Sequence, residues 1–262
     1  MIKTNFHTHT FRCKHAEGSD EDYVIQALEY GLVELGFSDH APWPNHPLDT
    51  RNIRMDISQM ADYVNSVNVL KRQYANRIKI YLGIEAEYYD GREDQLKDLI
   101  EKYDLEYVIL GNHFHRFETQ ARYYGHYADM EHLFTDYEHD TMMALESGLY
   151  DGFAHPDIFC KALSVWTPEA EAMSRRILLK AKELNIPVEY NLGGIRNRYT
   201  KMSYPYPRFW ELVAEIGGPV YIGVDAHSPL DLTDYQTILD AELTLKELGI
   251  APIEFLPFKR NR

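Results

Sequence analysis

Short apolar runs alternate along the whole chain with longer stretches in which apolar residues recur at helical spacing. Such an alternation predicts strands followed by helices, and repeated strand–helix units are typical of a parallel sheet. The apolar runs predict seven strands, at residues 2–6, 33–37, 78–84, 107–110, 152–154, 187–190 and 219–223.

Helical stretches fill the intervals between these strands. The first follows Ser19 and opens with acidic residues, as helix N-termini commonly do, and glycines follow several of the others. The later helices are predicted at residues 56–74, 92–102, 130–146, 167–184, 207–216 and 231–248. Residues 253–256 are either a short eighth strand or a tail. Because no linker-like stretch interrupts the pattern, residues 1–262 are expected to form one α/β barrel domain.

Every predicted strand ends in a histidine, aspartate, glutamate or asparagine. His7 and His9 follow the first strand, and because residues two apart on an extended chain face the same way, both imidazoles can reach one cation. The other strands end at Asp39-His40, Glu85, Asn112-His113, His155-Pro156-Asp157, Glu189-Tyr190-Asn191 and Asp225-Ala226-His227. A single histidine at a strand end is more often a structural residue than a ligand. Recurrence over all the strands predicts a metal site, because parallel barrels place their chemistry at the carboxyl ends of their strands.

The residue types and the net charge limit which metals and which partners suit this chain. Imidazoles and carboxylates without thiolates suit Zn²⁺, Mn²⁺ or Fe²⁺. The formal net charge of −14 argues against a nucleic-acid partner, since the only basic cluster is at residues 259–262. Bound cations can reverse the field locally, so a phosphate ester remains compatible with this charge.

The location of the protein is also constrained. No signal-peptide pattern precedes the first motif, and no apolar run is long enough for a membrane helix. A cytoplasmic protein without membrane association is therefore expected, with Cys13 and Cys160 as reduced thiols. The sequence leaves its oligomeric state open.

The strand-end residues together resemble the motifs of the polymerase and histidinol phosphatase (PHP) family, in family order over nearly the whole chain. The matching segments are His7-Thr8-His9, Lys14-His15-Ala16-Glu17-Gly18, Ser38-Asp39-His40-Ala41-Pro42, Gly83-Ile84-Glu85, Asn112-His113, Ala154-His155-Pro156-Asp157 and Asp225-Ala226-His227. The chain length and the segment from Asn191 to Arg196 are similar to the stand-alone bacterial members. The sequence departs from the family pattern at Asn112, where a small or aliphatic residue is expected, and over residues 116–126.

The resemblance implies a distorted (β/α)7 barrel with three divalent metal ions at the C-terminal ends of the strands. Carried over residue by residue, it implies three ligand sets: His7, His9, Glu85 and Asp225; Glu85, His113 and His155, with Glu85 bridging; and His15, His40 and His227. Two cations sharing Glu85 would share a hydroxide able to attack phosphorus in line. Asp225 and His227 are the catalytic candidates for supplying the leaving group with a proton.

Four residues are predicted to contact the substrate. Arg196, after the sixth strand, and Arg116, past the fourth, offer the planar guanidinium that suits phosphate, although a solvated surface arginine is the plainer alternative. His115 could line the mouth of the barrel, and Asn191 ends the sixth strand.

Two further features bear on the substrate. Glu118 or Asp157 could recognise a cationic amine or imidazole. The loops 114–126 and 192–206 carry several tyrosines, and are either aromatic lids or surface loops packed by their own rings.

The resemblance implies a phosphomonoesterase that hydrolyses L-histidinol phosphate to L-histidinol and phosphate, a step of histidine biosynthesis. The alternatives are a phosphoesterase of the same family that acts on another small phosphate ester or on nucleic acid. The acidic charge and the absence of a basic arm argue against nucleic acid.

Overall fold

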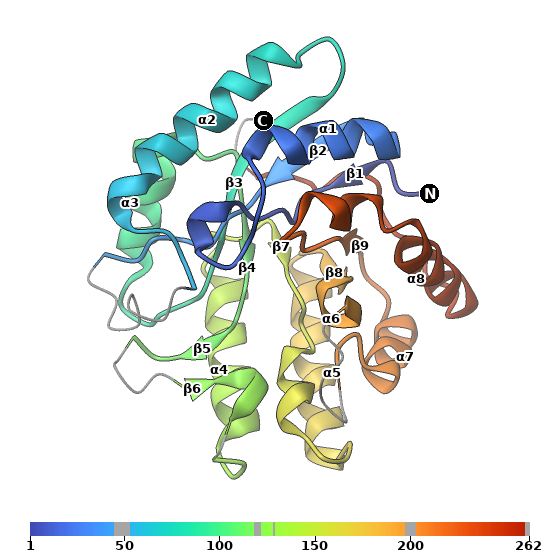
Figure 1. The fold of residues 1–262 in the computed structure, drawn as a ribbon. Helices are drawn as coiled ribbons and strands as arrows, with labels where there is room; N and C mark the ends of the chain where they lie inside the picture. The colour runs from blue at the N-terminus through green and yellow to red at the C-terminus, as the bar shows by residue number, and fades with distance from the viewer. Residues whose placement is uncertain (45–52, 118–121, 128, 197–202, 260–262) are drawn as a thin grey trace.

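The computed structural model describes residues 1–44, 53–117, 122–127, 129–196 and 203–259. Its centre is a seven-stranded parallel sheet in the order β1-β2-β3-β4-β7-β8-β9 (Figure 1). The strands are β1 (Thr4–Asn5), β2 (Glu34–Phe37), β3 (Lys79–Ala86), β4 (Tyr107–Leu110), β7 (Gly152–Phe153), β8 (Val188–Asn191) and β9 (Val220–Gly223). Every neighbouring pair is parallel, so all seven carboxyl ends lie at one edge of the sheet.

The first and last strands come together just beyond their carboxyl ends, which nearly closes the barrel. Thr8 and Ala226 form an isolated parallel bridge there. The side chain of Asn5 supports the junction, since its oxygen accepts a hydrogen bond from the backbone N–H of Val224 at 2.8 Å.

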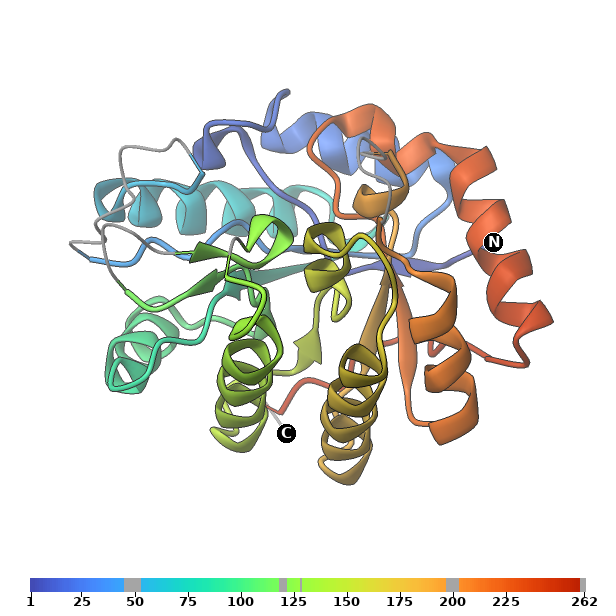
Figure 2. The ribbon, with the colours of Figure 1, turned by 90° about the horizontal axis from the view of Figure 1, so that it is seen from below.

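Helices lie around the strands, as the view in Figure 2 shows. They are α1 (Asp20–Tyr30), α2 (Met60–Gln73), α3 (Glu93–Tyr103), α4 (Leu133–Glu146), α5 (Pro168–Glu183), α6 (Gly193–Arg196), α7 (Pro207–Ile216) and α8 (Tyr235–Glu247). Short 3₁₀ turns supplement them: η1 (Phe11–Cys13), η3 (Ile57–Gln59), η4 (Tyr124–His126), η5 (Ile158–Ala162) and η6 (Pro229–Thr233). No helix among the described residues is long and apolar enough to cross a lipid bilayer.

Local sequence explains where several helices begin and end. Ser19 and Asp22 form a reciprocal capping box at the start of α1, and Gly31 ends that helix with a φ of 95°. Thr167 caps α5, whose first residue is Pro168. These signals are readable in the sequence because they act over a few residues.

The structure confirms the predicted (β/α)7 barrel, with strand bounds shifted by at most two residues at either end. Residues 253–256 do not form an eighth strand, so the alternative of a tail applies. Ile253 donates one hydrogen bond to the carbonyl of Val220, but no strand forms there. The segment predicted as a loop at residues 114–126 contains a small antiparallel hairpin of β5 (Phe114–His115) and β6 (Arg122–Tyr123). These strands are too short for a periodic signal. The expectation of one domain over residues 1–262 stays a prediction.

The floor of the barrel is built around the ring of Tyr107. Its hydroxyl donates a hydrogen bond to the carbonyl of Phe6 at 2.9 Å. Gly36 on β2 and Gly83 on β3 lie against this ring so closely that a methyl group at either position would overlap it. The ring therefore fills the space that two missing side chains leave, below the polar strand ends.

We predict that Gly83→Ala destabilises the fold by about 1–3 kcal/mol, because the added methyl group overpacks the contact with Tyr107. Urea unfolding of the metal-free protein measures this cost without a contribution from metal binding. In a Tyr107→Leu background the cost should shrink, because the ring that meets the methyl group is gone. Strictly additive costs of the two substitutions would contradict the packing explanation.

Candidate metal centre

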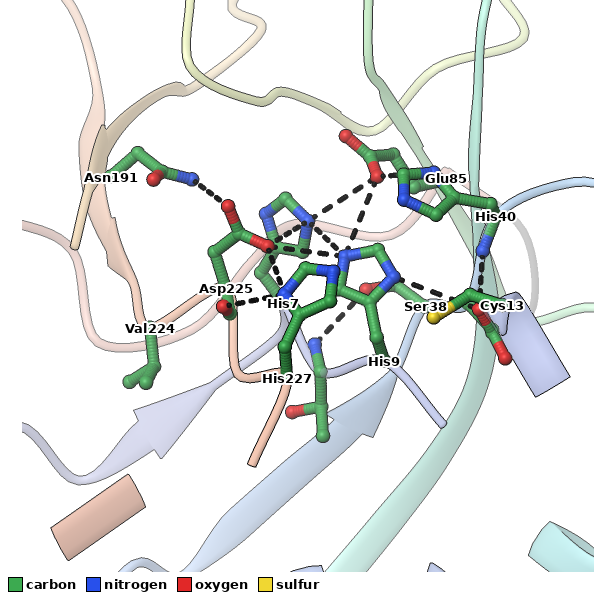
Figure 3. Close-up of polar contacts among 12 residues, drawn as sticks. His7, His9, Cys13, Ser38, His40, Glu85, Asn191, Val224, Asp225 and His227 are labelled. Atoms are coloured by element: carbon green, nitrogen blue, oxygen red, sulfur yellow. Dashed lines mark hydrogen bonds and ion pairs between the residues drawn. The ribbon is translucent and has the colours of Figure 1, made fainter. Parts of the chain in front are cut away.

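Imidazoles and carboxylates from all around the barrel converge at the carboxyl ends of the strands (Figure 3). The nine predicted ligands lie together there: His7, His9, His15, His40, Glu85, His113, His155, Asp225 and His227. His7 and His9 lie at the centre with no solvent exposure. Their Nε2 atoms are 3.0 Å apart, and Asp225 Oδ1 lies 3.4 Å from His7 Nε2 and 3.1 Å from His9 Nε2.

Glu85 stands between two groups of imidazoles. Its Oε1 atom lies 2.8 Å from His155 Nε2 and 3.4 Å from His113 Nε2. Its Oε2 atom lies 3.0 Å from His40 Nδ1, 3.5 Å from His7 Nε2 and 3.6 Å from His9 Nε2. Each oxygen of this carboxylate therefore faces a different set of rings.

A third group of rings lies at the outer side of the cluster. His227 Nε2 and His15 Nε2 are 3.0 Å apart, and both belong with His40 to one compact group. The turn η1 brings His15 back over the strand ends, because Lys14 ends that turn in the left-handed conformation with a φ of 69°.

The spacing of these atoms fits bound cations. Two ligands of a tetrahedral ion with bonds of about 2.0–2.1 Å lie roughly 3.3 Å apart, close to the separations between the ring nitrogens and carboxylate oxygens here. In the described part of the chain, buried Glu85 Oε2 lacks a well-aligned hydrogen-bond donor, although three imidazoles surround it. A buried carboxylate oxygen without a donor is unfavourable in a protein alone and is the natural partner of a cation.

The electrostatics also fit. Burial favours the neutral form of Asp225, but His7 and His9 outweigh burial and hold the pKa of its carboxyl well below the ordinary value. Burial lowers the pKa of His9, but hydrogen bonds to Asp225 and Asp39 overcome it and raise that pKa to about 9. The carboxylates therefore favour positive charge at the centre of the cluster, whereas burial and the neighbouring His9 lower the pKa values of His15, His40 and His227.

Two of the nine predicted ligands occupy disfavoured backbone conformations. The φ angles are 30° at His155 and 53° at Asp225, both in the left-handed region that residues other than glycine seldom adopt. Such strain persists only where the surrounding structure enforces it, and it is concentrated at functional sites.

The thiols of Cys13 and Cys160 are free and buried. Cys13 Sγ lies within 4.8 Å of ligand atoms of His9 and His227. Burial raises the pKa of both thiols, which keeps them protonated and unreactive.

A cavity of about 1140 Å³ opens over the cluster. Its wall away from the strand ends is aromatic and apolar, with one lysine: Ile53, Phe114, Tyr123, His126, Ile158, Lys161 and Tyr204. A smaller cavity of about 500 Å³ shares His15, Asp225 and His227 with it, so the outer rings border both spaces.

Arg196 lies beside the smaller cavity. Its Nη2 atom donates hydrogen bonds to the carbonyls of Val224 and Asp225, at 2.5 and 2.9 Å, and its Nε atom pairs with Asp231 at 3.2 Å. Its Nη2 atom therefore holds the carbonyls just after β9, whereas its buried Nη1 atom has no hydrogen-bond partner among the described residues. Its contact with a substrate stays a prediction.

Asn191 is buried inside the cluster. Its amide nitrogen donates to Glu189 Oε2 at 2.7 Å and to Asp225 Oδ2 at 3.2 Å, and its oxygen accepts the backbone N–H of Gly194. Its direct contacts are with residues of the centre, and its predicted contact with a substrate stays a prediction.

His115 and Arg116 do not line either cavity. The ring of His115 contacts Asp140 at 2.9 Å and the hydroxyl of Tyr124 at 3.2 Å, which ties the β5–β6 hairpin to α4. Arg116 Nε donates to His115 Nε2. Their predicted substrate contacts stay predictions.

The carboxyl group of Asp157 accepts hydrogen bonds from the backbone N–H of Tyr206 and the indole N–H of Trp210, and the residue is 1% exposed. It therefore anchors α7 instead of facing the cavity. Glu118 lies outside the described residues.

Sequence analysis missed a layer of carboxylates behind the rings. Glu189 Oε1 contacts His7 Nδ1 at 2.7 Å, Asp39 Oδ1 lies 3.6 Å from His9 Nδ1, and Glu87 Oε1 lies 3.5 Å from His113 Nδ1. Asp39 and Glu189 stand in the strand-end motifs without an assigned role. Glu87 follows Glu85 by two residues, and that same-face spacing could have identified it.

Buried imidazoles and carboxylates at the strand ends place the chain among parallel α/β barrels that carry a candidate metal centre at that edge. The chain belongs to the PHP domain family, whose profile matches residues 5–192. It is 30% identical over 232 residues to the "Probable histidinol-phosphatase" of Deinococcus radiodurans, covering 85% of each chain. It is 28% identical to the "Histidinol-phosphatase" of Bacillus subtilis, covering 88% of this chain and 96% of the relative.

A crystal structure of the Lactococcus lactis histidinol phosphate phosphatase, in complex with zinc, L-histidinol and phosphate, has the same fold. It superposes with a TM-score of 0.74 at 19% identity, over 96% of this chain and 95% of the other. Together with the family match, these relatives indicate a phosphoesterase of the PHP family.

We predict that Arg196→Lys lowers stability by about 1–3 kcal/mol, because a lysine cannot span the two carbonyls and Asp231 at once and leaves buried acceptors unpaired. Thermal unfolding measures the change. Arg176→Lys is the control, since Arg176 is 52% exposed and pairs with Glu138 at the surface, where such a pair contributes little. An equal loss in both variants would count against a special role for Arg196.

Proposed function

We propose that the chain is a metal-dependent histidinol-phosphatase, which hydrolyses L-histidinol phosphate to L-histidinol and phosphate. The observation that carries this proposal is the buried cluster of nine ligand side chains opening into a cavity with an aromatic wall and a lysine. The names of the relatives and the ligands of the Lactococcus lactis structure support the choice of substrate.

The proposed ligand sets follow the three groups of side chains in the cluster. His7, His9, Glu85 and Asp225 would hold one cation, and Glu85, His113 and His155 a second, with one oxygen of Glu85 toward each. His15, His40 and His227 would hold a third. Nitrogen and oxygen donors of this kind suit zinc, manganese or iron.

Divalent cations bound there supply an acidified water molecule as nucleophile and positive charge for the phosphoryl oxygens. Asp225 turns Oδ1 toward His7 and His9 and keeps Oδ2 beside the amide of Asn191. Asp225 or His227 would supply the leaving alkoxide with a proton. Both ring nitrogens of His227 face polar atoms, at His15 and at the carbonyl of Asp225.

The cavity wall suits the rest of such a substrate. Lys161 is half-buried, burial lowers the pKa of its amine, and in the described part of the chain no carboxylate pairs with it. Its nearest polar partner is the hydroxyl of Tyr123 at 3.5 Å, and the ring of Tyr204 lies close by. An ammonium group without a counter-ion can bind a phosphate oxygen, while the rings around it can pack against the organic part of the ester.

The deciding experiment is steady-state phosphate release by metal-replete protein from L-histidinol phosphate, beside a panel of nucleotides, sugar phosphates and a phosphodiester. We expect a kcat/KM for L-histidinol phosphate at least about 100-fold above the panel, since a site built for one polar substrate discriminates strongly. Equal kcat/KM values over the panel would be compatible with a phosphoesterase but would contradict L-histidinol phosphate as its preferred substrate. A preference for the diester would favour the nucleic-acid alternative.

We predict that Glu85→Gln lowers kcat/KM by more than about 100-fold and reduces the bound metal, because a neutral amide cannot bridge two cations. Metal content by elemental analysis and phosphate release on the same preparation test both effects. Glu138→Gln is the matched control, because Glu138 pairs with Arg176 on the outer surface of α4. Full metal content in Glu85→Gln would contradict the bridging role.

A further inference from the structure

Three rings of the cluster are each backed by a carboxylate, but the three carboxylates are held differently. Glu189 accepts hydrogen bonds from the backbone N–H of His155 and the amide of Asn191. Asp39 accepts the hydroxyl of Thr10 and the backbone N–H of His40. Among the described contacts, Glu87 alone of the three is held by a guanidinium group.

Both carboxylate oxygens and the backbone carbonyl of Glu87 accept hydrogen bonds. Arg54 grips it with two parallel hydrogen bonds, Nη1 to Oε2 at 3.0 Å and Nη2 to Oε1 at 2.9 Å. The indole N–H of Trp43 donates to Oε2 at 3.0 Å, and the hydroxyl of Tyr150 donates to the backbone carbonyl of Glu87 at 2.8 Å. Glu87 and Arg54 are 1% and 2% exposed. A buried, bidentate pair of this kind fixes the position of the carboxylate within a narrow range.

The fixed carboxylate lies behind one ligand. Glu87 Oε1 is 3.5 Å from His113 Nδ1, and the other nitrogen of the same ring, Nε2, is 3.4 Å from Glu85 Oε1. A proton on Nδ1 directed at Glu87 leaves the lone pair of Nε2 facing the centre, which is the tautomer that a metal ligand needs.

Arg54 adds a second connection. It borders the large cavity together with Glu87 and His113, and it comes from the segment just before η3, which belongs to no strand of the barrel. The cavity wall is therefore connected to the ring of His113 through the side chains of Arg54 and Glu87.

We propose that Glu87 is the positioning residue of His113, and that Arg54 fixes Glu87 in place, so that the segment carrying Arg54 is part of the metal centre. This inference rests on the proposed metal-dependent function. It assigns roles to a buried ion pair that otherwise costs desolvation energy without a clear benefit to stability.

The test is metal binding to chelator-treated protein, measured by titration with Co²⁺ and followed by visible absorption and calorimetry. Glu87→Gln should weaken binding about 10- to 100-fold and change the Co²⁺ spectrum, as losses of the partners behind metal-bound histidines do. The double variant Arg54→Met with Glu87→Gln removes the cation that the single variant leaves unpaired. It should regain thermal stability while metal binding stays weak.

Asp151→Asn is the matched control. Asp151 is as deeply buried as Glu87 and accepts hydrogen bonds from the backbone N–H groups of Val108 and Lys259 at the opposite end of the barrel. It should lose thermal stability and keep the metal affinity of the wild-type protein.

Two outcomes would overturn the positioning role: wild-type Co²⁺ affinity in Glu87→Gln, or wild-type affinity restored in the double variant, which would trace the loss to the unpaired Arg54. Failure of the wild-type protein to bind Co²⁺ is a different result. It would reject the proposed function itself, together with the centre on which Glu87 acts.

Discussion

The negative charge of Glu85 and Asp225 inside the barrel is the constraint on which the remaining arrangement depends. An ionised carboxylate removed from water costs several kcal/mol unless opposite charge and hydrogen bonds compensate it. Five imidazole rings lie within 3.6 Å of Glu85, at His7, His9, His40, His113 and His155. Neutral rings compensate such a charge poorly, whereas bound cations do so fully. The carboxylate oxygens of Glu85 and Asp225 are costly to bury without a cation, and for the same reason they suit a metal centre.

The parallel barrel is what brings these groups together. Its seven carboxyl ends meet at one edge, and the bridge between Thr8 and Ala226 draws the two ends of the sheet toward each other. That bridge lies beside His7, His9 and Asp225, so the near-closure of the barrel and the innermost ligand group are one local structure. The left-handed conformations of His155 and Asp225 show that the fold holds its ligands against backbone preference.

Around the converging rings and carboxylates lies a layer of polar groups that hold them in position. Glu189 orients His7, Asn191 joins Glu189 to Asp225, and Arg196 holds the carbonyls at the end of β9. The pair of Arg54 and Glu87 extends this layer to the cavity wall. A rigid second layer keeps each ring in the tautomer and position that metal binding would require.

The sequence by itself determined the strand–helix order and predicted the nine side chains that converge at the strand ends, because apolar periodicity and the residue after each strand are local properties of the chain. It also predicted the location of the site, since parallel strands present all their carboxyl ends at one edge of the sheet. Only the tertiary structure decided the partners of the remaining polar residues. His115 contacts Asp140, one nitrogen of Arg196 bonds two backbone carbonyls, and Glu87 meets Arg54 from a segment 33 residues away. Such pairings depend on which distant side chains the closed barrel brings within hydrogen-bond reach, and no local pattern encodes that distance.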